Sequence, residues 1–284
     1  MKAGGKPSPR RAARAVGLLA RWWVVPWLLG ACALSPAQRA PALPLSTLPA
    51  QGVLLLGEQH DNPHHQHLQQ QAVQHLLRRG TLNALALEMA PAGASTQGLP
   101  AHATDEAIQR ALRWSQAGWP WAPYAATIRL AVRAQVPVVG ANLPRAAIMA
   151  TMQDPSIDTS VPPQVWQQQR QAVAQGHCGL LPESQLDPMT RVQVARDQRM
   201  ARTLAALWRP GQVTVLLTGS AHANRTLGVP LHVPAQVPVT SVYMAPQGAA
   251  SSGFDVTWPA PAAPARDYCA ELKRQGMPKR PAAS

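Results

Sequence analysis

Two apolar segments of this 284-residue chain end in the same Gly-x-x-His pattern, and this repetition constrains the fold most strongly. Residues 53–56 lead into the first such turn at 57–60, and residues 213–217 lead into the second at 219–222. Short apolar segments that end at a turn indicate buried strands. Functional groups of an open parallel sheet gather just beyond the carboxyl ends of its strands, so both turns are predicted to meet at one edge. The side chains presented there are Glu58, His60 and His222.

Strand and helix patterns alternate along residues 51–274, which is typical of a single α/β domain with a mostly parallel central sheet flanked by helices. Asn62 is expected to cap a helix that begins at Pro63. Residues 146–208 are expected to form a helical insertion between two strands, and residues 275–284 a flexible tail. Further strands are predicted at 82–89, 136–141, 238–244 and 253–258, and further helices at 104–116, 124–135 and 267–274.

The N-terminus is typical of an export signal, because basic residues precede an apolar stretch at 22–31 that is too short to span a bilayer. Residues 29–32, Leu-Gly-Ala-Cys, resemble the bacterial lipobox, in which the cysteine is lipidated. We therefore expect a lipoprotein signal peptide at 1–31, lipidation of Cys32, and a Pro/Ala-rich tether at 32–50. An ordinary cleaved signal is the alternative, and export by the Sec or the twin-arginine route stays open.

Charge and motifs exclude several function classes. Six of the 26 cationic residues precede Cys32 whereas all 13 acidic residues follow it, so the formal charge of +13 falls to +7 in the mature chain. Its cations are scattered and not interleaved with aromatics, which argues against a nucleic-acid partner and leaves an anionic ligand possible. The sequence contains no motif for covalent c-type haem attachment, for a serine-hydrolase elbow, for a phosphate-binding loop or for a dinucleotide fingerprint.

Cysteine usage predicts one disulfide. Lipidation of Cys32 leaves only Cys178 and Cys269 in an exported protein. Two cysteines in an oxidising compartment are expected to pair. In the chain-entropy model, closing a loop of about 90 residues stabilises the fold by roughly 4 kcal/mol and holds the C-terminal segment against the body.

Polar side chains follow four of the predicted strands and form the candidate site. Two imidazoles and two carboxylates can bind a divalent metal or act as general acid and base. Glu88 interrupts an apolar strand, and a buried carboxylate needs a partner or a use. The alternative is that these groups only make structural hydrogen bonds. The strand-end candidates are Glu58, His60, Glu88, Asn142, Arg145 and His222.

Further histidines and aromatic residues offer iron ligands. His64 and His65 lie at the start of a helix and point about 100° apart, so only one is expected to face the pocket. Tyr124 follows a Trp-Pro-Trp segment at 119–121; together they can form a flat wall for a porphyrin, and a phenolate suits ferric iron. His177 adjoins a cysteine and is a further candidate. Ordinary core packing or solvation is the alternative for each of them.

The chain resembles the ChaN-like haem-binding lipoproteins, in the broader group that includes erythromycin esterases and TIKI-type proteins. The resemblance covers nearly all of residues 51–274 and lies in the order and spacing of short motifs. These motifs are residues 55–65, 87–89, 119–124, 141–145, 177–179, 193–201, 219–222, 228–230 and 267–269.

The resemblance implies an α/β domain on an outer-membrane lipid anchor facing the periplasm, non-covalent haem binding and a role in iron or haem uptake. Arg145 and Arg196 are compatible with the acidic propionates of haem. The axial ligand stays open among Tyr124 and the three candidate histidines. A homodimer with haem between two apolar faces and an outer-membrane haem receptor are possible partners.

The alternative function is hydrolysis of the erythromycin esterase or TIKI type. In that case Glu58, His60, Glu88 and His222 activate water, with or without a divalent metal. A haem-binding protein is the preferred hypothesis over an enzyme.

Overall fold

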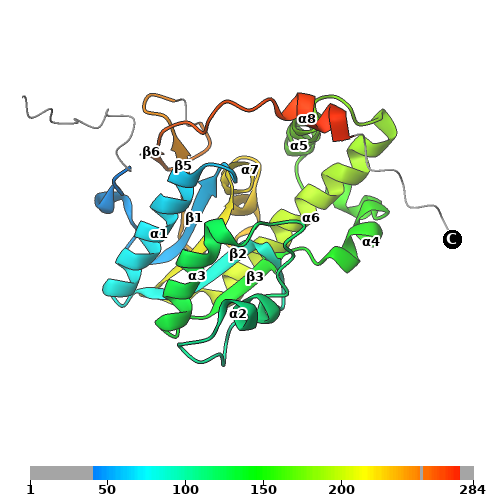
Figure 1. Ribbon diagram of the computed structural model, residues 1–284. Coiled ribbons are helices and arrows are strands. Elements are labelled where there is room, and N and C mark those ends of the chain that lie inside the picture. Colours follow the sequence, from blue (N-terminus) through cyan, green and yellow to red (C-terminus); the bar gives the residue numbers. More distant parts are fainter. Residues whose placement is uncertain (1–40, 250–251, 276–284) are drawn as a thin grey trace, which may run out of the picture. The chain divides into compact units, whose positions relative to one another are not determined.

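The computed structural model describes residues 41–249 and 252–275, which form a six-stranded sheet in the order β3-β2-β4-β1-β5-β6 (Figure 1). Every pair of neighbouring strands is parallel. The α/β fold with a parallel sheet is therefore confirmed. The strands are β1 (Gly52–Glu58), β2 (Leu82–Pro91), β3 (Val138–Asn142), β4 (Val213–Gly219), β5 (Val239–Ala245) and β6 (Val256–Pro259).

Helices follow most of the strands, as the alternating sequence pattern predicts. Asn62 caps α1 by accepting a hydrogen bond from the His64 amide at 3.0 Å. The helix predicted at 104–116 is shorter, because Arg113 adopts a φ of 49° and ends it. The helices are α1 (Pro63–Arg78), α2 (Asp105–Ala111), α3 (Ala122–Arg133), α4 (Ile148–Met152), α5 (Pro163–Gly176), α6 (Glu183–Leu207), α7 (Ser220–Ala223) and α8 (Tyr268–Gln275), with short 3-10 turns at Leu45–Thr47, Arg145–Ala147, Pro155–Thr159 and Val229–His232.

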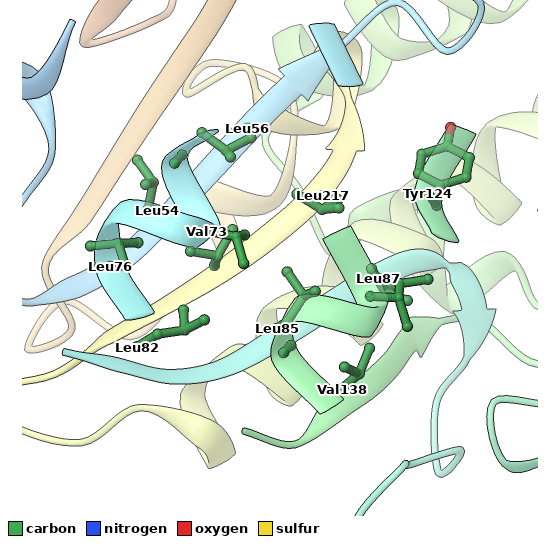
Figure 2. Close-up of a cluster of buried hydrophobic side chains, with 14 of the residues drawn as sticks. Leu54, Leu56, Val73, Leu76, Leu82, Leu85, Leu87, Tyr124, Val138 and Leu217 are labelled. Atoms are coloured by element: carbon green, nitrogen blue, oxygen red, sulfur yellow. The ribbon is translucent and has the colours of Figure 1, made fainter. Parts of the chain in front are cut away.

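The two faces of the sheet are covered by different helices. Side chains alternate along each strand, so Leu54 and Leu56 face one side and Val53 and Leu55 the other. Figure 2 shows Leu54 and Leu56 packed with residues of α1 and of the neighbouring strands. The opposite face packs against apolar residues of α6 and α7. Both faces are covered, so every residue of β1 and β4 is buried, and most of these residues are apolar.

A crevice forms between the carboxyl ends of β1 and β4. These strands are neighbours, with Glu58 opposite Gly219. The helix that follows β1 covers one face of the sheet, whereas α7, which follows β4, covers the other. Chain segments that diverge in this way leave an opening at the end of the sheet, which is the usual ligand site of open α/β folds.

The segments that flank the sheet differ in how they attach. Leu48 is buried and Trp258 Nε1 donates to Thr47 Oγ1 at 2.8 Å, so the part of the predicted tether near residue 48 packs on the domain. At the other end, residues 261–274 include no buried side chain. The predicted signal peptide, Cys32, and the tail beyond residue 275 lie outside the described residues. None of the described helices has the length and apolar character needed to cross a membrane.

Candidate functional site

A cavity of about 630 Å³ opens at the crevice between β1 and β4. It is lined by strand-end residues of β1, β2 and β4, by one side of α5 and α6, by Trp119, and by the segment that leads into α8. Its volume lies within the range of small-molecule sites in proteins. The polar groups that line it form two histidine-carboxylate pairs, one from each Gly-x-x-His turn.

The first pair joins His60 to the last residue of β1. Glu58 is 2% exposed, and its Oε1 lies 2.7 Å from His60 Nδ1. The same oxygen accepts a hydrogen bond of 2.6 Å from the Tyr124 hydroxyl, and Gln69 donates to the other oxygen at 2.8 Å. Burial lowers the pKa of His60, but the Glu58 hydrogen bond and the Glu88 charge outweigh burial and raise that pKa. The first turn thus presents an imidazole that is held by a buried carboxylate.

The second pair, His222 with Glu88, extends to a third ionisable group, Asp197, and all three side chains are buried. Glu88 Oε2 accepts hydrogen bonds of 2.8 Å from Thr218 Oγ1 and from the Gly219 amide. Its Oε1 lies 3.6 Å from His222 Nε2, and His222 Nδ1 lies 2.6 Å from Asp197 Oδ1. Burial lowers the pKa of His222, but the two carboxylates dominate and raise it to about 9. His222 is therefore a buried imidazolium between two acids at neutral pH.

The glycines of the two turns permit close packing at the site. A Cβ on Gly219 would lie 2.9 Å from His60 Nε2, so the first imidazole rests directly on the second turn. A Cβ on Gly57 would lie 2.9 Å from both Ala223 Cβ and the Val242 carbonyl oxygen. Both glycines of the repeated Gly-x-x-His pattern therefore stand at close contacts, and the Gly57 contact leaves no room for a side chain. The prediction that both turns share one edge is confirmed.

The predicted disulfide is present between Cys178 and Cys269. The bond links Cys178, which lies just beyond the end of α5, to Cys269 in α8. The helices α5 and α8 lie side by side in Figure 1. His177 precedes one cysteine and Tyr268 precedes the other, and both side chains line the cavity. His177 Nδ1 lies 2.8 Å from the Val173 carbonyl oxygen, which makes Nδ1 the donor and leaves the lone pair of the neutral ring on Nε2.

The helix-start histidines lie away from the cavity, contrary to the expectation that one of them faces it. His65 is buried; its Nδ1 accepts from the Gln59 amide at 2.9 Å, and its Nε2 contacts Asn62 Nδ2 at 3.1 Å. Burial and the neighbouring His64 lower the pKa of His65 to about 4. Both ring nitrogens of His65 thus hold the turn in place, and His64 does not line the cavity in the described structure.

The aromatic residues predicted to form one wall around Tyr124 are not all in the cavity: Tyr124 and Trp121 are buried in the core, and Trp119 lines the cavity. Tyr124 is 2% exposed and packs at the end of the core cluster with its hydroxyl directed away from the leucines (Figure 2). Burial and the Glu58 charge raise the pKa of Tyr124. Trp121 is also buried, so Trp119 is the member of this group that lines the cavity. Arg145 is exposed and does not line the cavity either.

Three buried polar side chains at the site are not among the candidate site residues, although Asp197 lies within the 193–201 motif of the family resemblance. Asp197 and Gln69 are buried, although each lies on a helix whose polar residues are expected to face solvent. Gln169 of α5 is also buried and donates to Asp197 at 3.2 Å. These side chains are buried because α5 packs against α6 and α1 packs against β1. Such contacts between elements cannot be predicted from local sequence patterns.

The fold and the cavity define an α/β protein with a cavity at the carboxyl edge of its parallel sheet. Residues 45–233 match the family described as "Haem-binding uptake, Tiki superfamily, ChaN", so the chain belongs to this family. The chain is similar to ChaN of Campylobacter jejuni, solved with cofacial haem, at 24% identity and a TM-score of 0.61, covering 73% of this chain and 87% of that one. A mutant of erythromycin esterase EreC in its open conformation is 13% identical with a TM-score of 0.43, and the match covers 72% of each chain. No curated protein matches the chain.

Proposed function

We propose that this protein binds haem non-covalently at the cavity between β1 and β4 and takes part in haem or iron uptake. Membership of the ChaN family supports this proposal, as does the fold shared with the Campylobacter jejuni protein. The observation that carries it is the convergence of His177 and Tyr268 on the same cavity. Imidazole and phenolate are both protein ligands of haem iron.

The residues around the cavity fit a haem group. Trp119 and Tyr268 supply aromatic surface, and His177 supplies an imidazole lone pair. Tyr268 is 45% exposed and donates a hydrogen bond to Asp61, a carboxylate placed to accept the proton that iron ligation releases. Bound haem would supply a ferric centre that takes such ligands, and the chain would hold it as cargo.

A haemin titration followed by absorbance tests the proposal on the signal-free domain. We expect a saturable Soret shift in the wild type, and a displaced band or weaker binding in Tyr268→Phe and His177→Ala. Tyr243→Phe and His64→Ala are matched controls because neither side chain lines the cavity. Absence of saturation in the wild type, or equal changes in test and control variants, would refute the assignment.

Hydrolysis is a second candidate, favoured by the meeting of two histidine-carboxylate pairs at Gly219. His60, held by Glu58, can act as general base, and the buried imidazolium of His222 can stabilise developing negative charge. Among the described residues, no group of three or more His, Cys, Asp or Glu side chains is arranged to hold a metal ion.

An ester-hydrolysis assay with chromogenic substrates separates the two candidates. If hydrolysis is the function, Glu58→Gln and His222→Asn should abolish turnover with unchanged circular dichroism, while Tyr268→Phe retains it. Turnover that persists in both variants, or that is absent from the wild type, removes this candidate.

The cellular setting belongs to the proposal as well. We propose export, lipidation at Cys32 and an outer-membrane anchor facing the periplasm, with delivery of haem from an outer-membrane receptor. Mass spectrometry of the mature protein tests the anchor, since a diacylated Cys32 terminus should be lost in Cys32→Ala. Sedimentation with and without haemin tests the homodimer, because a monomer at every haem ratio would exclude it.

A further inference from the structure

Arg196 lines the cavity and forms no ion pair with any residue that the structure describes. Arg196 belongs to α6, and its Nε is fully buried with no hydrogen-bond partner. Within the described residues, no carboxylate pairs with its guanidinium. The other arginine lining the described cavity, Arg266, is already neutralised, because its Nε and Nη2 donate to the two oxygens of Glu271 at 2.8 and 2.6 Å.

The acid next to Arg196 in sequence is used by other groups. Asp197 Oδ1 contacts His222 at 2.6 Å, and its Oδ2 accepts a hydrogen bond of 3.2 Å from Gln169. Gln169 also donates to the Leu227 carbonyl oxygen at 2.8 Å, which fixes this arrangement. Arg196 and His222 both line the cavity, and the positive charge of Arg196 opposes the raised pKa of His222. The hydrogen bonds of Asp197 therefore go to His222 and Gln169, and the described residues show no hydrogen bond or ion pair between Arg196 and a carboxylate.

What distinguishes Arg196 is that its guanidinium lines the cavity, where a ligand can supply the acceptor that the described residues do not. Planar carboxylates match the donor fork of arginine and form strong charge-assisted hydrogen bonds with it. Gln193, one turn earlier on the same helix, also lines the cavity and can donate a further hydrogen bond. The chemistry of this wall thus favours a carboxylate.

We propose that Arg196 is a carboxylate-binding subsite of the cavity and holds a propionate group of haem. This inference rests on the proposed haem-binding function and deepens it by naming the residue that recognises the acidic edge of the porphyrin. It also predicts selectivity, because a porphyrin without free carboxylates lacks the group that this subsite binds.

The test compares haemin with its dimethyl ester, in which both propionates are neutral. Arg199 offers a matched control, because it lies on the same helix and also has a buried, unpartnered Nε, but does not line the cavity. Titrations of both ligands into the wild type, Arg196→Gln, Arg196→Lys and Arg199→Gln are followed by absorbance, with thermal unfolding as a check of the fold.

We expect Arg196→Gln to weaken haemin binding roughly 10-fold or more, as loss of a charge-assisted hydrogen bond predicts, and to leave ester binding unchanged. Arg196→Lys should recover part of the loss, and Arg199→Gln should bind like the wild type. Equal wild-type affinity for haemin and ester, or equal losses in Arg196→Gln and Arg199→Gln, overturns the subsite but not haem binding. Failure of the wild type to bind either porphyrin refutes the proposed function, and this inference with it.

Discussion

Alanine substitution at Gly57 and at Gly219 should have different consequences, although both glycines hold the first position of the repeated turn. At Gly57 the new Cβ would lie 2.9 Å from Ala223 Cβ, 2.9 Å from the Val242 carbonyl oxygen and 3.1 Å from a Cα of α7. Two of those atoms are backbone and the third is a Cβ fixed to the backbone, so none of them can move without a shift of α7 or β5. At Gly219 the nearest atom is His60 Nε2 at 2.9 Å, at the tip of a side chain that is 38% exposed.

The expected magnitudes follow from these contacts. Gly57→Ala forces α7 away from β1, and overpacking of this kind costs about 1 to 3 kcal/mol of unfolding free energy. Gly219 has φ −63° and ψ 150°, which any residue adopts. Alanine there gains up to about 1 kcal/mol from the unfolded chain and loses a similar amount when His60 leaves Glu58. Gly219→Ala should therefore be nearly neutral for stability.

Urea unfolding and NMR titration of His60 measure the two effects. We expect a lower midpoint for Gly57→Ala alone, and in Gly219→Ala a fall of the His60 pKa toward its usual value, because the Glu58 hydrogen bond that raises it is lost. Equal destabilisation of both variants, or an unchanged His60 pKa in Gly219→Ala, would refute the reasoning.

Other predictions concern the buried imidazolium and the disulfide. The pKa of His222 is raised from 6.5 to about 9 in the folded protein. Protonated His222 therefore adds on the order of 3 kcal/mol to the free energy of unfolding. This stabilisation is complete below about pH 6.5 and is lost as the pH rises through about 9. Urea midpoints across this range should fall in the wild type and much less in Asp197→Asn; parallel curves contradict the prediction. Reduction of Cys178–Cys269 should raise hydrogen exchange in 261–274, which includes no buried side chain, and leave the central strands protected. The stability loss should be smaller than the roughly 4 kcal/mol of the chain-entropy model, because the reduced native segment also regains freedom; a full loss would contradict this. Thiol assay of the non-reduced mature domain should find no free cysteine, and one free thiol would contradict the pairing.

The sequence predicts the parts of the site that depend on local pattern. The apolar segments before 57–60 and 219–222 identify β1 and β4, and parallel-sheet geometry brings their ends together. The cap at Asn62 and the pairing of two cysteines also follow from short-range or compositional rules.

The rest depends on which way a side chain turns once helices pack. His65 is drawn into the turn by the amide of Gln59, a contact that helical spacing does not reveal. Tyr124 sits on the buried face of α3, so its hydroxyl supports Glu58 from behind the cavity. Tyr268 lines the cavity because contacts between distant segments place it there, namely the disulfide that joins α8 to the end of α5 and the hydrogen bonds of its hydroxyl group with Gln59 and Asp61.

Crystallographic location of the iron in a haemin complex tests the central claim most directly. Anomalous diffraction at the iron edge should place the metal within ligating distance of Tyr268 or His177, with the porphyrin carboxylates toward Arg196. An iron position elsewhere on the protein, or crystals that take up haemin without an ordered iron peak, would contradict the account.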